Sequence, residues 1–63
     1  MFNANLLFKI MNNKPATVEY WKDESFQKIQ GFIRKIDMLN NRLLLDTENE
    51  NAEISMSQIT QIY

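Results

Sequence analysis

Four cations in the middle of the sequence have the residue types and spacing of a nucleic-acid contact. They are Lys28, Arg34, Lys35 and Arg42. In an extended strand, Lys28, Phe32 and Arg34 share one face, and a basic stripe that contains an aromatic ring can follow a phosphate backbone and stack a base. The alternative is a solvated strand face with Glu19 opposite Lys28 as a cross-strand ion pair. Charge runs are usually solvated surface, which favours the alternative.

Asp37, Asn40 and Asn41 suit either a turn or a binding site. Asn adopts positive φ at little cost, and Asp accepts hydrogen bonds from backbone amides further along the chain, so a hairpin turn is their ordinary role. The other hypothesis is a knuckle in which Asp37 and Asn41 hold the edge of a base. The sequence favours the turn and leaves the knuckle as part of the nucleic-acid hypothesis.

Acidic and nucleophilic residues give no pattern for metal binding or catalysis. Asp46, Glu48 and Glu50 have the alternating spacing of an EF-hand loop, but Asn51 and Ser57 stand where that loop needs Gly and Glu. The chain has no His and no Cys, which excludes the usual general base, the thiol nucleophile, a disulfide and a conventional zinc site. We therefore expect a protein that is not an enzyme and needs no cofactor.

Aromatic and apolar residues form a second candidate site, for a protein partner. Trp21 and Phe32 fall in the strand phase opposite to Val18 and its inward-facing neighbours. If both are exposed, they form an apolar patch of the kind that marks interfaces; the alternative is that the N-terminal helix covers them. The last strand carries Ile59 and Tyr63, and its free edge is able to pair with another chain.

The elements that must position these residues are one short helix and five strands. The helix is predicted over residues 3–12, and the strands over residues 16–21, 26–38, 42–46, 52–56 and 59–63. Asn3 or Asn5 caps the helix, Asn12 and Asn13 tolerate a left-handed residue at its C-terminus, and Pro15 prevents its continuation. Its apolar residues form one stripe that we expect to face the core, namely Leu6, Leu7, Ile10 and Met11.

The long second strand is predicted to bend. After Ile33 the next large apolar residue is Ile36, a step of three that breaks the two-residue period, and a bulge at Arg34 and Lys35 restores it. Gly31 within a strand indicates a bend or a close approach of another backbone. The bend and the short connections predict a small closed barrel, because closure removes the free edges of a sheet.

Length and composition limit the classes of protein. The chain has 63 residues, of which 44% are hydrophobic, and a net charge of −1. We expect one domain over residues 1–63, which buries about 60% of the surface of its unfolded chain. A dedicated nucleic-acid binder usually has a strong basic excess. No apolar run approaches a membrane span and no signal peptide is apparent, so we expect a cytoplasmic protein without membrane contact.

Residues 16–63 resemble the Sm-like form of the SH3-like barrel, and most closely the YolD-like family of bacterial proteins. The resemblance rests on Tyr20–Trp21, on Gly31 followed by "IRKIDMLNNRLLL", and on Ile54 with "ITQI". Asp37 and Asn41 have the spacing from Gly31 that Sm-like proteins show. The Arg–Gly pair with which Sm rings complete a uridine pocket is missing from "SMSQ".

The resemblance implies an accessory protein of a Y-family translesion DNA polymerase, with a role in DNA repair. We therefore expect a small adaptor that binds a protein partner through Trp21, Phe32, Ile59 and Tyr63. The alternative is a weak RNA or single-stranded DNA binder that uses the four cations with Asp37 and Asn41. A third hypothesis is a homo-oligomer, a ring or dimer joined through the edges of the last two strands.

Overall fold

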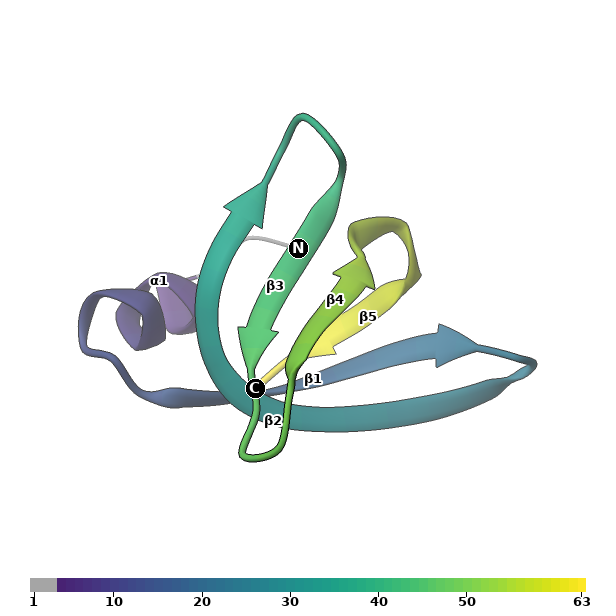
Figure 1. The fold of residues 1–63 in the computed structure, drawn as a ribbon, viewed down its shortest axis with the longest axis horizontal. Helices are drawn as coiled ribbons and strands as arrows, with labels where there is room; N and C mark the ends of the chain where they lie inside the picture. The colour runs from purple at the N-terminus through teal and green to yellow at the C-terminus, as the bar shows by residue number, and fades with distance from the viewer. Residues whose placement is uncertain (1–3) are drawn as a thin grey trace.

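The computed structural model describes residues 4–63 as one short helix and one antiparallel sheet of five strands (Figure 1). The elements are α1 (Ala4–Met11), β1 (Pro15–Lys22), β2 (Ser25–Asp37), β3 (Arg42–Asp46), β4 (Asn51–Ser55), the 3₁₀ turn Met56–Gln58 and β5 (Ile59–Ile62). The strand order is β4-β3-β2-β1-β5. The prediction of a mainly β, five-stranded fold with a short N-terminal helix is confirmed.

A tight two-residue turn joins β1 to β2. Lys22 pairs with Ser25, and between them Asp23 and Glu24 adopt positive φ of 52° and 63°. Turns with positive φ at both central residues match the right-handed twist of the flanking strands. The Gln27 side-chain amide donates to the Lys22 carbonyl at 3.1 Å. The hairpin therefore has a single register, in which Trp21 lies opposite Phe26.

The predicted bulge in β2 is confirmed. Ile33 pairs with Leu45, Lys35 with Leu44 and Ile36 with Leu43, so the ladder shifts by one residue between Ile33 and Lys35. Two residues of β2 oppose one of β3 here, and β2 curves through this region (Figure 1). As a result Ile33 and Ile36 both pack against the core.

Gly31 lies where β2 passes close to another backbone, as predicted. A Cβ atom at this position would be 2.6 Å from the Asp46 carbonyl oxygen and 3.3 Å from the Thr47 Cα. Both contacts are with backbone atoms, which cannot rotate away as a side chain can. The end of β3 therefore approaches β2 at a distance that only glycine permits.

The core lies inside the curved sheet. Its buried members are Leu6, Ala16, Val18, Leu43, Leu45, Ile54, Met56 and Ile62. They come from the helix, from four of the strands and from the 3₁₀ turn, so the core holds together segments from the whole described chain. Leu43 and Leu45 are buried while Leu44 between them is half-buried, so β3 is partly covered on its outer face as well.

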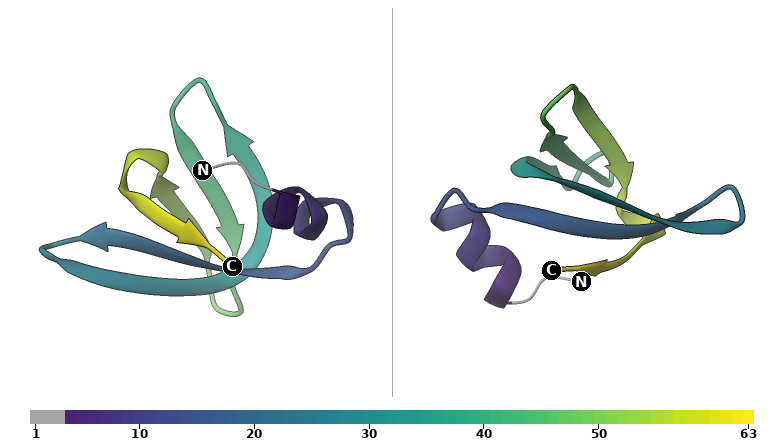
Figure 2. Two further views of the ribbon diagram at one scale, coloured as in Figure 1. Left: turned by 180° about the vertical axis from the view of Figure 1, so that it is seen from behind. Right: turned by 90° about the horizontal axis from the view of Figure 1, so that it is seen from below.

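The helix forms, but most of its apolar stripe does not face the core as expected. Leu6 is 1% exposed, whereas Leu7 is 53% and Met11 82% exposed, and Ile10 is exposed as well. Only one side chain of the stripe reaches the core, because α1 meets the sheet near the start of β1 and does not lie along it (Figure 2). The helix ends at Met11, and Asn13 just beyond it has a φ of 52°, which confirms the predicted left-handed residue. Asn5 is the second residue of the helix and so is not at the N-cap position where it was predicted, and Asn3 lies outside the described residues.

The barrel is less closed than predicted. Throughout residues 4–63, β4 and β5 are the two ends of the strand order, and no ladder joins them. Only the 3₁₀ turn Met56–Gln58 connects them. Each therefore has one free edge. In the part of the chain that the structure describes, no helix has the length and hydropathy needed to cross a membrane.

Candidate functional site

The outer face of the β1–β2 hairpin carries side chains from alternate cross-strand pairs. Ala16 and Val18 are buried, so the residues between them point outward. From the tip of the hairpin, the outward pairs are Trp21–Phe26, Glu19–Lys28, Thr17–Gln30 and Pro15–Phe32. This face combines aromatic and charged side chains on one rigid two-stranded element.

At the tip, Trp21 and Phe26 form an aromatic pair. Their ring centroids are 4.7 Å apart and the ring planes meet at 74°, an edge-to-face arrangement. Such pairs contribute about 0.5–1.5 kcal/mol beyond the area that they bury. Trp21 nevertheless remains 45% and Phe26 63% exposed. Phe26 was missed as a site residue, although the four-residue turn "KDES" already implied its place opposite Trp21.

In the centre of the face, Lys28 lies over the ring of Tyr63. The Lys28 Nζ is 5.6 Å from the ring centroid, within the range of a cation–π contact. Tyr63 is held there because its backbone N–H donates to the Thr17 carbonyl at 2.8 Å and its carbonyl accepts from the Thr17 N–H at 3.2 Å. The predicted interface residue Tyr63 therefore joins the hairpin face.

The register places Glu19 opposite Lys28, as predicted. Within residues 4–63, however, the two make no ion pair. The Glu19 carboxylate accepts a hydrogen bond of 2.8 Å from the Thr60 hydroxyl instead. The Lys28 ammonium thus stays on the outer face, beside an aromatic ring.

Trp21 and Phe32 are both exposed, but the structure does not bring them together. Trp21 pairs with Phe26 and Phe32 with Pro15, at opposite ends of the β1–β2 ladder, which places them roughly 20 Å apart at 3.3 Å per residue. Ile59 is half-buried against the core. We therefore define the aromatic face by its exposed rings, Trp21, Phe26, Phe32 and Tyr63.

The four candidate cations do not form one stripe. Arg34 Nε is 3.1 Å from Asp46 Oδ1, and Arg42 Nε is 3.5 Å from Glu53 Oε1. Lys28 lies on the β1–β2 hairpin, and the bend in β2 separates it from Arg34 and Arg42. In the described part of the chain, Lys35 makes no ion pair. Carboxylates therefore balance half of the positive charge proposed for a nucleic-acid contact.

Asp37 and Asn40 form the turn between β2 and β3. The Asn40 side-chain amide donates to Asp37 Oδ2 at 2.9 Å, and the Asn40 backbone N–H donates to Oδ1 at 3.1 Å. Asn41 adopts a φ of 55°. Both carboxylate oxygens of Asp37 are occupied within the turn, as its structural role requires. The turn presents Met38 and Leu39 to solvent.

The hydrogen bonds from Asn40 lower the pKa of the Asp37 carboxyl below its ordinary value of 3.8. Because the folded pKa is the lower one, ionised Asp37 stabilises the turn above pH 3.8, and this stabilisation is lost as the pH falls through the folded pKa. We expect a carboxyl NMR titration of Asp37 to have a midpoint below 3.8, and Asn40→Ala to raise it towards that value. Asn12→Ala, in a different turn, serves as the control. An Asp37 midpoint that Asn40→Ala leaves in place would contradict this account.

The acidic loop after β3 is held by hydrogen bonds between Thr47 and Glu50. The Thr47 N–H donates to the Glu50 carbonyl at 2.8 Å, and the Glu50 N–H donates to the Thr47 hydroxyl at 3.0 Å. Asp46 is turned to Arg34. Across residues 4–63, no group of three acidic side chains is close enough to hold a metal ion.

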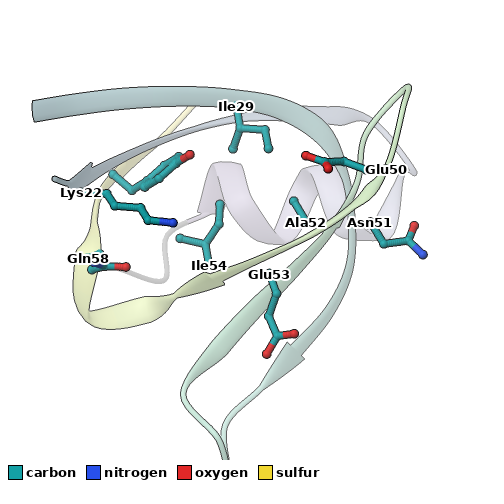
Figure 3. Close-up of a pocket in the computed structure, with 9 residues that line it drawn as sticks. Lys22, Ile29, Glu50, Asn51, Ala52, Glu53, Ile54 and Gln58 are labelled. Carbon is teal, nitrogen blue, oxygen red and sulfur yellow. The ribbon is translucent and has the colours of Figure 1, made fainter.

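A hollow of about 280 Å³ lies between β4 and the inner face of the β1–β2 hairpin (Figure 3). Its lining comes from the hairpin, from the end of the loop before β4, from the first four residues of β4 and from the last residue of the 3₁₀ turn. The lining residues are Tyr20, Lys22, Ile29, Glu50, Asn51, Ala52, Glu53, Ile54 and Gln58. No residue of this hollow was predicted as a site, because it exists only where the sheet fails to close.

These features define a small, mainly β domain with an exposed aromatic face on one hairpin, two free strand edges and a hollow beside one of them. The chain belongs to the YolD-like protein family, whose model matches residues 1–63. The match confirms the resemblance seen in the sequence and extends it over the N-terminal helix. Comparisons with curated proteins and with solved structures find no match.

Proposed function

We propose that this chain is a non-enzymatic adaptor or accessory protein that docks a protein partner through the aromatic face. The observation that carries the proposal is the exposure of four aromatic rings on one hairpin and the strand end beside it, Trp21, Phe26, Phe32 and Tyr63. Aromatic residues are enriched at interfaces and supply most of their binding energy. The core of the domain contains none of the four, so they are not needed to fill it.

The charges on the molecule favour a protein over a nucleic acid as the partner. Arg34 and Arg42 are paired with carboxylates, and the net charge of the chain is −1. A nucleic-acid contact needs cations that are free to displace counterions from phosphates. Only Lys28 lies within the aromatic face, and it already contacts the Tyr63 ring.

The first partner to test is a Y-family translesion DNA polymerase, which is what membership of the YolD-like family suggests. The rigid hairpin would bring its aromatic face to an apolar surface of such a partner without reorganisation of the adaptor, since the register and the turn already hold these side chains in place. Preorganised contacts avoid part of the entropic cost of binding.

We expect Phe26→Ala to weaken binding of the host's Y-family polymerase roughly 30-fold, the equivalent of about 2 kcal/mol for an aromatic hot spot. Phe26 is exposed and outside the core, so the variant should stay folded and lose about the 0.5–1.5 kcal/mol of its ring contact with Trp21. Phe8→Ala removes an equally exposed ring on α1 and is the matched control. Calorimetric titration of the polymerase with each variant measures the effect.

Equal affinity of the Phe26 and Phe8 variants would contradict the aromatic face as the docking surface. Titration of single-stranded DNA and RNA at two salt concentrations tests the alternative function. Tight binding at low salt with a steep loss at higher salt, abolished by Lys28→Ala, would favour a nucleic-acid binder instead.

A further inference from the structure

The hollow beside β4 has the form of a strand-binding slot, and the inference below assumes that the chain is an adaptor. Four consecutive residues, Asn51 to Ile54, line it. Neighbouring side chains of a strand point to opposite faces of the sheet, so a hollow that is lined by all four reaches β4 from its edge. We call this hollow the β4 slot.

The backbone of β4 has hydrogen-bonding groups to offer at this edge. The Met56 N–H donates to the Asn41 carbonyl at 3.0 Å, continuing the β3–β4 register. In an antiparallel ladder, the N–H and C=O groups of alternate residues point the same way. Those of Ala52 and Ile54 therefore point to β3, and those of Asn51 and Glu53, with the N–H of Ser55, point away from it. This row of outward groups is a template for one more strand.

The slot has a few apolar side chains between two ends of opposite charge. Ile29 lies on one side, and Ala52 and Ile54 point towards it from the other (Figure 3). Lys22 and Gln58 lie at the end where β4 finishes, and Glu50 lies at the end where it begins (Figure 3). Among the described residues, neither Lys22 nor Glu50 makes an ion pair.

We propose that the β4 slot binds an extended segment of a partner protein as an added antiparallel strand. The bound segment has alternating apolar side chains, which pack against Tyr20, Ile29 and Ile54. Antiparallel addition continues the pairing of this sheet and is the more frequent kind. An antiparallel segment starts at the Lys22 end and finishes at the Glu50 end, so it carries an acidic residue first and a basic residue last.

Two capped heptapeptides test the polarity of the slot. In the first, Thr alternates with Val between an N-terminal Glu and a C-terminal Lys, so that the two Val share a face with the charged ends; in the second, the Glu and Lys are exchanged. We expect the acid-first peptide to shift the backbone amide NMR signals of Asn51, Glu53 and Ser55, and to bind at least tenfold more tightly than the base-first peptide. The double variant Lys22→Glu, Glu50→Lys should reverse that preference.

Glu53→Pro tests the free edge, with Glu53→Ala as its matched control. Both variants lose the ion pair with Arg42, but only proline removes the outward N–H and places a ring at the edge, where proline is tolerated. We expect Glu53→Pro to weaken the acid-first peptide more than tenfold relative to Glu53→Ala. If Glu53→Pro does not fold, the preference of the double variant Lys22→Glu, Glu50→Lys for one of the two peptides decides whether the slot binds an added strand.

Several results would overturn the β4 slot. The two peptides could bind equally well, or neither could bind, or the amide shifts could be confined to other strands. A dimer in light scattering that Glu53→Pro dissociates would also overturn it, because β4 would then be a contact between copies of this chain. Polymerase that binds the parent and Glu53→Pro equally well would overturn the slot and leave the adaptor function standing. Polymerase that binds neither would count against the proposed adaptor function.

Discussion

Replacing Gly31 with alanine is expected to destabilise the domain by about 1–3 kcal/mol, the usual cost of forcing extra volume into a packed site. The added Cβ would lie 2.6 Å from the Asp46 carbonyl oxygen and 3.1 Å from its carbonyl carbon. Relief requires β2 and β3 to separate where Phe32 pairs with Asp46. Fewer conformations of the unfolded chain would return about 0.4–1 kcal/mol, which is less than the expected cost.

A loss of this size is large for a small protein. At about 0.05–0.15 kcal/mol per residue, a chain of 63 residues has a total stability of roughly 3–9 kcal/mol. Urea unfolding followed by Trp21 fluorescence would measure the change in midpoint. Gln30→Ala, at the exposed neighbouring position, should change the stability by less than about 0.5 kcal/mol. An unaltered midpoint for Gly31→Ala would mean that β3 does not approach β2 this closely.

Replacing Leu6 with alanine is expected to have the second large effect, about 2–5 kcal/mol as for other buried leucines. Leu6 is 1% exposed and, within residues 6–11 of α1, is the only one in the buried core. The variant would lose the buried side chain that fixes the helix to the sheet and would leave a cavity in the core. A helix of eight residues is not stable in water without such packing.

Leu7→Ala is the matched control for this experiment, because it makes the same chemical change one position further along the helix. Leu7 is exposed, so its loss should cost no more than about 0.5 kcal/mol. Hydrogen exchange of the α1 amides separates the two variants further, since undocking of the helix would deprotect them. Equal losses for the two variants would place the anchor of the helix elsewhere.

Local patterns predicted the features of this fold that depend on neighbouring residues. The step from Ile33 to Ile36 indicated the bulge, because side-chain alternation is a property of a single strand. Gly31 indicated a close backbone approach for the same kind of reason. Asn13 and Asn41 were placed in turns by their tolerance of positive φ, and both adopt it.

Features that depend on segments far apart in the sequence were not predictable in this way. The apolar stripe of α1 is genuine, but its spacing does not say at which angle the helix meets the sheet, so the burial of Leu7 and Ile10 was overestimated. The pairing of Arg34 with Asp46 depends on the β2–β3 register across the bulge. The β4 slot exists because β4 and β5 do not pair to close the sheet, and no local sequence pattern predicts this.

The bulge in β2 has a consequence for how proteins of this shape can change in evolution. Two residues, Arg34 and Lys35, oppose one residue of β3, and both are exposed. Loss of one codon here would leave Ile33 and Ile36 on the same face, so the residues on each side of the bulge would keep their inward or outward orientation. Loss of one codon elsewhere in β2 would reverse that orientation. Arg34–Lys35 is therefore the position in β2 where a change in length alters the curvature of the sheet and spares its core.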